Sequence, residues 1–391
     1  MRVLRELNIK IHDAVVDRGF VCKVFKFQTP NGWTLGTSRT GDQGHPEEFC
    51  VATSRHAIQQ CLAEAIPKEV IQYAEVKLVL VEHGKKPVVV LADGAEHRAD
   101  LVIGADGVRS AVKSGVFDAE DAKLYAPVYS YVCSGLGYLM EINLPRRGSC
   151  GVGGFLQTQL PEHLLREQSM TFTFGRSGSF GYAPVNSHSG DQLLWWSSYE
   201  SEAPPRKREI DPNHIRRMLQ ARHQGWWDPL ITTVLYNAKV DTVWPTWTLP
   251  DLPYWGRDGC VLVGDAAHAL NPASGQGVSQ ALEDAATLPL LLAGYLRQNT
   301  TDPERAIALS IKGFYEIRKD RVKGFAETAK KVGSPKVRPS FIAQLGLYIL
   351  MWAVTHLSWF GKLAFGDLLK IYSWRASAEV ERKLAEKPNM D

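Results

Sequence analysis

Two apolar segments, each running into a tight glycine–aspartate turn, constrain the fold of this chain more than any other feature. The first is LVIGADGVRS at 101–110, and the second is VLVGDAAHALNPASGQG at 261–277. Each pattern is typical of a buried strand, a turn and the start of a helix. That arrangement places a carboxylate and free backbone N–H groups at the carboxyl edge of a sheet, where α/β folds hold nucleotides. The chain is therefore predicted to be an α/β protein.

Together the two segments resemble the Asp-Gly and Gly-Asp motifs of the FAD-dependent monooxygenases, the single-component flavoprotein aromatic hydroxylase family. The resemblance covers about residues 1–330. It implies an FAD/NAD(P)-binding nucleotide fold with an inserted, mainly antiparallel β-sheet substrate domain, followed here by a C-terminal helical tail. It also implies FAD and NAD(P)H as cofactors, and NAD(P)H- and O2-dependent hydroxylation or epoxidation of a hydrophobic organic substrate in secondary metabolism.

The family's N-terminal Gly-x-Gly-x-x-Gly unit is absent from this sequence. Family members open with a strand, that glycine turn and a helix, whereas this chain opens with MRVLREL, which resembles a later helix of the family. The glycines at 151–154 lack the strand–turn–helix context. We therefore expect an N-terminally truncated nucleotide fold that binds FAD weakly, and coding sequence upstream of Met1 is one explanation that stays open.

The resemblance assigns cofactor contacts around the second motif. Asp265 would bind the ribityl hydroxyls of FAD, and the helix that begins near Gly277 would point its positive end at the flavin. From the residues alone, Asp265 is also explained as the N-cap of a short helix. His268 is expected to belong to the turn and not to act as a general base. The residues implied to hold the cofactor here are Gly264, Asp265, Pro272, Gly275, Gly277 and the backbone N–H of Val278.

Two further groups of cofactor contacts follow from the resemblance. Asp106, Gly107 and Arg109 would position FAD and guide the nicotinamide cofactor, and Arg55 would approach the FAD phosphates. Asp106-Gly107 is equally explained as a plain turn between a strand and a helix. Arg55 is also explained as a solvated arginine at a helix start.

The coarse order of elements predicts four regions. Residues 1–115 form a partial FAD-binding domain, 116–250 the substrate domain, 251–330 the return of the chain to the FAD-binding domain, and 331–391 an apolar helical tail. Apolar spacing predicts a helix over 1–17, Asn31-Gly32 predicts a hairpin, and Ser54 predicts the cap of a helix over 55–66.

Substrate recognition is expected in the aromatic-rich strands of 116–250. Arg176, Tyr182 and Trp195 are the candidates there, together with His188, although packing or surface exposure also explains each of them. The segment 129–135 carries no arginine, which argues against a simple phenolic acid as substrate. No catalytic side chain is predicted, because in a flavin enzyme the cofactor performs the oxygen transfer.

Composition excludes several classes of function. The net charge is +3 without a basic stripe, so we expect no nucleic-acid partner. Six scattered cysteines without a Cys-x-x-Cys pair argue against a zinc site or a disulfide framework, and fit a reducing compartment such as the cytoplasm.

The segment 341–361 contains no Asp, Glu, Lys or Arg over 21 residues and is flanked by basic residues. Its length reaches that of a bilayer span. A buried helix that closes over the core and a helix that docks on a membrane surface explain it equally well, both ahead of a true membrane span, so the protein is expected in the cytoplasm or on an intracellular membrane.

A different class of function also fits the scaffold. A non-redox cyclase or isomerase, or a binding protein inactive toward FAD, would explain the missing N-terminal unit. An upstream coding sequence with a Gly-x-Gly-x-x-Gly motif would decide for the flavin enzyme.

Overall fold

The computed structural model describes residues 1–41, 49–129, 148–186, 190–201, 204, 211–240, 243–299, 301–332, 340–357 and 373–386. The chain divides into two compact units, each assembled from separate stretches. Unit 1 comprises Met1–Lys68, Tyr131–Thr246 and Val332–Trp374, and unit 2 comprises Glu69–Ser130, Trp247–Lys331 and Arg375–Asp391. Residues 1–68, predicted as part of the nucleotide domain, thus pack with the 131–246 stretch. The functional division into 1–115, 116–250, 251–330 and 331–391 stays a prediction.

Unit 1 is built around a seven-stranded sheet of order β14-β10-β13-β12-β11-β2-β3. Neighbouring strands are antiparallel except β11 and β2, which are parallel, so the sheet is mainly antiparallel as predicted. Gly32, at φ 83°, lies in the turn between β2 and β3, which confirms the hairpin. The strands of unit 1 are β1 Phe20–Cys22, β2 Val24–Gln28, β3 Thr34–Arg39, β4 Cys50–Ala52, β10 Gly148–Gln157, β11 Ser169–Gly175, β12 Gly178–Pro184, β13 Gln192–Ser201 and β14 Trp244–Pro245.

The helices of unit 1 follow their capping residues. The single helix predicted over 1–17 is wrong, because Asn8 adopts extended backbone (φ −163°) and its side chain accepts a hydrogen bond from the Lys10 N–H, which starts a second helix. Ser54 accepts from the Ala57 N–H and begins the predicted third helix. The helices are α1 Arg2–Leu7, α2 Ile9–Asp17, α3 Arg55–Glu64, α6 Glu162–Glu167, α7 Pro212–His223, α8 Pro229–Asn237 and α12 Phe341–His356.

Helices α7 and α8 cover one face of the seven-stranded sheet. Ser197 and His223 form a hydrogen bond of 2.8 Å between β13 and α7. The Tyr182 hydroxyl donates to Asp228, the N-cap of α8, at 2.7 Å. Because side chains alternate between the two faces of a strand, this contact fixes which residues point toward the helices.

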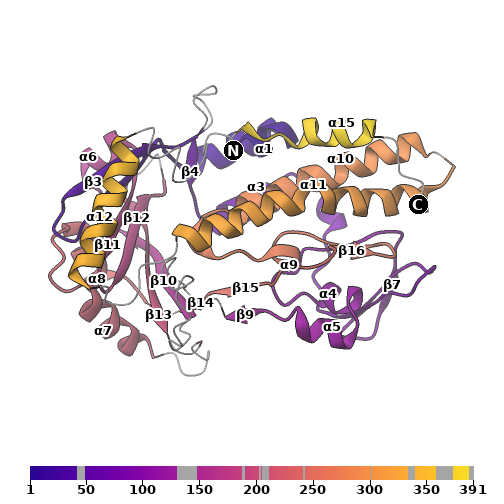
Figure 1. Cartoon of the computed structure of the whole chain (residues 1–391), viewed down its shortest axis with the longest axis horizontal. Coiled ribbons are helices and arrows are strands. Elements are labelled where there is room, and N and C mark those ends of the chain that lie inside the picture. The colour runs from indigo at the N-terminus through magenta and orange to yellow at the C-terminus, as the bar shows by residue number, and fades with distance from the viewer. Residues whose placement is uncertain are drawn as a thin grey trace. The chain divides into compact units, whose positions relative to one another are not determined.

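The tail helix α12 lies against β3 on the other face of the sheet (Figure 1). A Cβ atom on Gly36 would collide with Thr355, so glycine permits this close approach. The Tyr348 hydroxyl donates to the carbonyl of Phe174 at 2.6 Å. Across the described ranges of the chain, no helix combines the length and apolarity that a membrane span requires.

Unit 2 contains three small sheets, of orders β16-β17-β8, β5-β6-β7 and β15-β9. Only β17 and β8 are parallel to each other; the remaining pairs are antiparallel. The strands are β5 Val76–Leu80, β6 Val88–Leu91, β7 Glu96–Arg98, β8 Val102–Gly104, β9 Val128–Tyr129, β15 Trp247–Thr248, β16 Gly256–Arg257 and β17 Cys260–Leu262.

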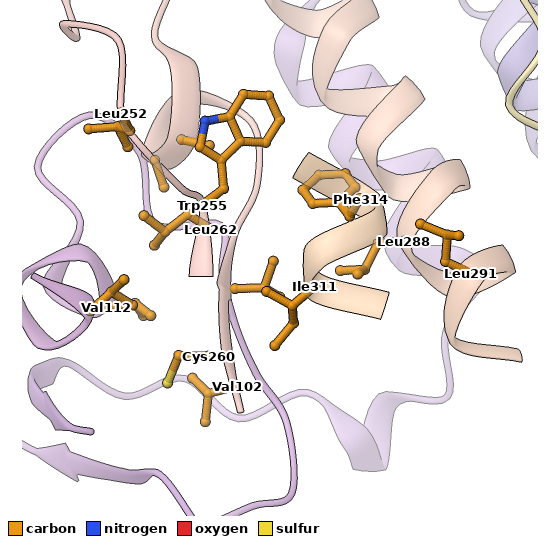
Figure 2. Packing of buried hydrophobic residues seen from close by; sticks show 14 of the residues in the cluster. Val102, Val112, Leu252, Trp255, Cys260, Leu262, Leu288, Leu291, Ile311 and Phe314 are labelled. Carbon is orange, nitrogen blue, oxygen red and sulfur yellow. The ribbon is translucent and has the colours of Figure 1, made fainter. Parts of the chain in front are cut away.

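The core of unit 2 packs β8 and β17 against two long helices. Figure 2 shows Val102 of β8 and Leu262 of β17 together with Leu288 of α10 and Phe314 of α11 in this core. Leu262, Leu291 and Phe314 are wholly buried. The helices of unit 2 are α4 Ala111–Val116, α5 Ala119–Leu124, α9 Asp265–His268, α10 Gly277–Gln298, α11 Pro303–Val332 and α15 Ala376–Ala385.

Candidate functional site

The two sequence motifs meet at one sheet edge in unit 2. The parallel strands β8 and β17 are neighbours, with Leu262 opposite Gly104. The Val263 N–H then donates to the Gly104 carbonyl at 3.0 Å. Because the strands run in the same direction, the turns that follow them lie beside each other at the carboxyl edge. Segments 160 residues apart in sequence therefore build one site.

The Gly264-Asp265 turn presents an unengaged carboxylate. Gly264 adopts φ 57° and ψ −138°, a conformation that disfavours residues with a side chain, and a Cβ atom there would approach Ala281 to 3.3 Å. Gly264 is the N-cap of α9, so Asp265 is its first residue. No side chain caps this helix. Asp265 is exposed and has no hydrogen-bond partner in the part of the chain that the structure describes. The helix-cap explanation of Asp265 therefore lacks its hydrogen bond.

Asp106 has a local structural role. Its Oδ2 atom accepts hydrogen bonds from the N–H groups of Ala111 at 2.7 Å and Val112 at 3.3 Å, at the start of α4. Ser110 caps the same helix through the Lys113 N–H. Gly107 follows at φ 81°, with open space where a side chain would stand. These contacts are those of a turn between strand and helix, and they leave Asp106 exposed at the same sheet edge as Asp265.

Arg109 lies in the loop between β8 and α4 with its guanidinium exposed. The guanidinium carbon is 5.3 Å from the ring centroid of Trp247, in a cation–π contact. Trp247 belongs to β15, so this contact ties the first motif to the strand pair β15-β9.

The loop before α10 is open and its helix start is uncapped. Pro272 begins a short 3-10 turn, Pro272–Ser274, and Gly275 follows in the left-handed region at φ 61°. A Cβ atom added to Gly275 or Gly277 would meet nothing within 4 Å. Gln276 is the N-cap of α10 but its side chain makes no capping hydrogen bond, and Val278 is 62% exposed in the first turn. The positive end of α10 is therefore available to a polar or anionic group.

A buried carboxylate behind the Gly-Asp turn holds that turn in place. Asp284 of α10 accepts at Oδ2 from the Gly264 N–H at 2.8 Å and forms a 2.7 Å hydrogen bond with His268 Nε2. Its Oδ1 atom accepts from Arg318 Nε at 2.8 Å. Asp284 and Arg318 both have fully buried side chains. His268 thus belongs to the architecture of the turn, as expected.

The network continues along α10 and α11. Arg318 also pairs with Glu283 and donates to Gln280 Oε1 at 2.7 Å. Arg321 forms a bidentate pair with Glu283, with both N···O distances at 2.6 Å. Burial alone would raise the pKa of Asp284, but His268, Arg318 and the Gly264 amide outweigh burial and hold this pKa below its ordinary value. The carboxylate therefore stays charged.

Sequence reasoning missed Asp284 and Arg318. The side of α10 that carries Val278, Ala281, Leu282 and Ala285 is exposed or half-buried. The helix instead buries a stripe that contains Gln280, Glu283, Asp284, Thr287, Leu288 and Leu291. The available sequence signal for this buried polar stripe was the i, i+3, i+4, i+7 spacing of Gln280, Glu283, Asp284 and Thr287. Arg318 and Arg321, three residues apart on the next helix, added to that signal.

The other predicted site residues belong to unit 1. Arg55 is the exposed first residue of α3. Tyr182 and Trp195 are opposite each other on β12 and β13 and are buried on the face that α7 and α8 cover. Burial raises the pKa of Tyr182 and nearby Asp228 adds to the shift, so the phenol stays protonated. Arg176 is exposed in the turn after β11, and His188 lies outside the described residues.

The opposite face of the sheet carries a group of half-buried aromatic rings. Phe172 lies 5.7 Å from Phe25, 5.8 Å from Phe27 and 5.5 Å from Trp196, centroid to centroid. Phe174 lies 6.4 Å from Phe27. We call these five residues the aromatic platform. Gly181, between Phe172 and Trp196 in register, leaves the room that the Trp196 ring occupies.

The described residues contain no candidate metal site. No group of three or more His, Cys, Asp or Glu side chains there is arranged to hold a metal ion.

Comparison with known sequences relates the chain to flavoproteins. The family model of the FAD binding domain matches residues 148–303. Salicylate hydroxylase of Pseudomonas putida is 28% identical over 276 residues, which cover 70% of this chain and 60% of that protein. Chloroplastic zeaxanthin epoxidase of Spinacia oleracea is 30% identical over 278 residues, which cover 69% of this chain and 36% of that protein. The chain thus spans less than two thirds of the length of each of these relatives.

Solved structures show the same fold. HpxO of Klebsiella pneumoniae, complexed with FAD and uric acid, matches with a TM-score of 0.71 at 19% identity, covering 94% of this chain and 85% of that one. A substrate complex of salicylate hydroxylase matches with a TM-score of 0.68 at 18% identity, covering 100% of this chain and 89% of that one.

Proposed function

Since this chain belongs to the family of FAD-dependent monooxygenases, we propose that it catalyses the NAD(P)H- and O2-dependent hydroxylation or epoxidation of a hydrophobic organic molecule, in secondary metabolism. One oxygen atom of O2 enters the substrate and the other leaves as water, with both electrons supplied by NAD(P)H. FAD, when bound, supplies the redox chemistry that protein side chains lack.

The observation that carries this proposal is the exposed carboxylate of Asp265, which has no hydrogen-bond partner among the described residues, together with the uncapped start of α10. A carboxylate accepts hydrogen bonds from sugar-alcohol hydroxyls, and the N–H groups of a helix start attract a polar or anionic ring edge. The open space at Gly275 and Gly277 lets a flat ring approach the backbone. The residues present therefore fit FAD, with Asp265 and the Val278 N–H as binding groups and Asp284 as the residue that orients the turn.

Further contacts proposed for the cofactors come from the first motif and from unit 1. Asp106, Gly107 and Arg109 border the same sheet edge, and Arg109 keeps an exposed guanidinium that suits a phosphate or a nicotinamide cofactor. Arg55, exposed at the start of α3, is proposed as a phosphate contact.

The aromatic platform supports a neutral, lipophilic substrate. Its five rings carry no charge and are only half buried on the same face of the sheet as α12, so their uncovered surface offers apolar contact and ring stacking. Tyr182 and Trp195 are packed beneath α7 and α8. We propose that they support the sheet from the face opposite the platform, and that the platform contacts the substrate. Arg176 is proposed as a residue at the edge of this site.

Inside the cell, the cytoplasm or an intracellular membrane surface is the location that we propose. The five cysteines that the structure describes are free thiols, which fits a reducing compartment. No observation favours the non-redox alternative.

The test titrates FAD into the purified chain by flavin fluorescence and then measures NAD(P)H oxidation. We expect weak but saturable binding that Asp265→Ala weakens further, whereas Asp320→Ala, at an exposed carboxylate on α11, leaves it unchanged. Equal loss in both variants, or no saturable binding, would contradict the site.

A second measurement addresses the substrate. Zeaxanthin, which is neutral and lipophilic, should stimulate NAD(P)H oxidation more than salicylate, an anion, because the five rings themselves carry no cation and Arg176 lies only at the edge of the site. Stronger stimulation by salicylate would overturn the proposed substrate class while leaving the FAD site intact.

A further inference from the structure

The tail helix α12 turns polar residues toward the protein and apolar residues away from it. Gln344 is buried, and Tyr348 and Thr355 donate hydrogen bonds to the carbonyls of Phe174 and Leu35, at 2.6 and 3.3 Å. The large apolar residues lie outward, with 41–81% of their surface exposed: Phe341, Ile342, Leu345, Ile349, Leu350 and Trp352. A helix that closes over a core shows the opposite arrangement.

The dimensions of α12 suit a helix that lies on a membrane. Its 16 residues extend over about 24 Å, which is shorter than the roughly 30 Å hydrocarbon core of a bilayer. The hydrogen bonds of Tyr348 and Thr355 also hold the helix along the sheet of unit 1. An interfacial helix inserts only one apolar face, to a depth of about 5–10 Å.

The charges that precede α12 in the sequence favour an anionic surface. From 328 to 340 the sequence contains Lys330, Lys331, Lys336 and Arg338 and no acidic residue, and from 341 to 361 it contains no charged residue at all. Basic segments next to an apolar helix are attracted to anionic lipid headgroups. A second copy of the chain would instead bring two basic segments together, which like-charge repulsion disfavours.

We propose that the outward face of α12 docks this protein flat on an anionic lipid surface. The exposed apolar residues enter the boundary between headgroups and acyl chains, and the basic sequence that precedes the helix favours anionic headgroups. This docking does not depend on the proposed catalytic activity, although it suits an enzyme whose substrate dissolves in lipid.

The test is flotation of the purified full chain with vesicles. Phosphatidylcholine vesicles that contain phosphatidylserine should carry the protein to the top of a density gradient, and phosphatidylcholine vesicles or added salt should carry less. The double variant Ile342→Glu, Ile349→Glu should lower the vesicle-bound to free ratio by about tenfold or more, since charged residues do not enter the apolar boundary. Val70→Glu with Tyr73→Glu adds the same charge at exposed positions of unit 2 and should float like the parent chain.

Fluorescence gives a second measurement. Brominated phosphatidylcholine mixed with phosphatidylserine should quench part of the tryptophan emission, and this part should disappear in Trp352→Phe because Trp352 lies on the outward face. Absence of flotation with either vesicle overturns the proposal, as does equal flotation of the two double variants. Self-association that only the Ile342, Ile349 pair abolishes, without flotation of the parent, would assign the face to a second copy and also overturn it.

Discussion

Replacement of Asp284 by alanine is expected to lower the free energy of unfolding by about 3–5 kcal/mol, the usual cost of removing one partner from a buried ion pair. The carboxylate serves three donors, namely the Gly264 N–H, His268 and Arg318. After truncation, the Arg318 guanidinium is left buried beside an empty position. Asp284→Asn keeps one acceptor oxygen but turns an N–H2 group toward a donor, and should cost less, about 1–3 kcal/mol.

The matched control is Asp265, which follows Gly264, the residue whose N–H donates to Asp284. Asp265 is exposed and makes no hydrogen bond within the described ranges, so Asp265→Ala should change stability by no more than about 0.5 kcal/mol. If Asp265 binds FAD, the same variant should weaken FAD affinity by about 1–3 kcal/mol, or roughly 5- to 150-fold in Kd.

Urea unfolding followed by circular dichroism, together with FAD titration by flavin fluorescence, separates the two carboxylates. The reasoning fails if Asp284→Ala unfolds at the urea midpoint of the parent chain. It also fails if Asp265→Ala loses as much stability as Asp284→Ala, because Asp265 would then have a structural partner.

Three further outcomes are expected. Burial and the neighbouring Arg222 lower the pKa of His223 from 6.5 to about 3, so between these pH values the unfolded chain binds one proton more than the folded chain. The free energy of unfolding should therefore fall by about 2 kcal/mol from pH 7 to pH 5. Urea unfolding at both pH values should show a smaller fall for His223→Gln. Trp195→Ala should cost about 3–5 kcal/mol in a thermal melt, whereas Trp196→Ala should cost less and mainly reduce zeaxanthin-stimulated NAD(P)H oxidation. Gly264→Ala should lower stability by about 1–3 kcal/mol, and an unchanged melting temperature would contradict the left-handed backbone assigned to that turn.

The sequence was sufficient to predict the strands and turns of the candidate site because its signals there are local. The apolar runs before Gly104 and Gly264, and the turn residues after them, depend on neighbours within a few positions. The Asp284–Arg318 pair joins residues 34 positions apart on two helices. Nothing local distinguishes such a buried acid from a solvated one, so only packing reveals it.

The substrate sheet shows a second limit. Trp195 and Trp196 are consecutive on one strand, so the period of two places them on opposite faces. The sequence does not say which face α7 and α8 cover, and Trp195 is the one they bury. Likewise, the hairpin at Asn31-Gly32 was predictable, but the parallel pairing of β2 with β11 joins residues about 145 positions apart and leaves no local pattern.

The strand pair β9-β15 has a consequence for how such a scaffold diversifies. Tyr129 and Trp247 are opposite each other in this pair, so the chain leaves unit 2 and returns to it through two strands about 4.8 Å apart. Because both ends of the stretch between Tyr129 and Trp247 are held in this strand pair, its length and sequence can change without separating β8 from β17. The strands that this stretch adds to the sheet of unit 1, β10 to β14, can therefore change while the Gly-Asp edge stays the same.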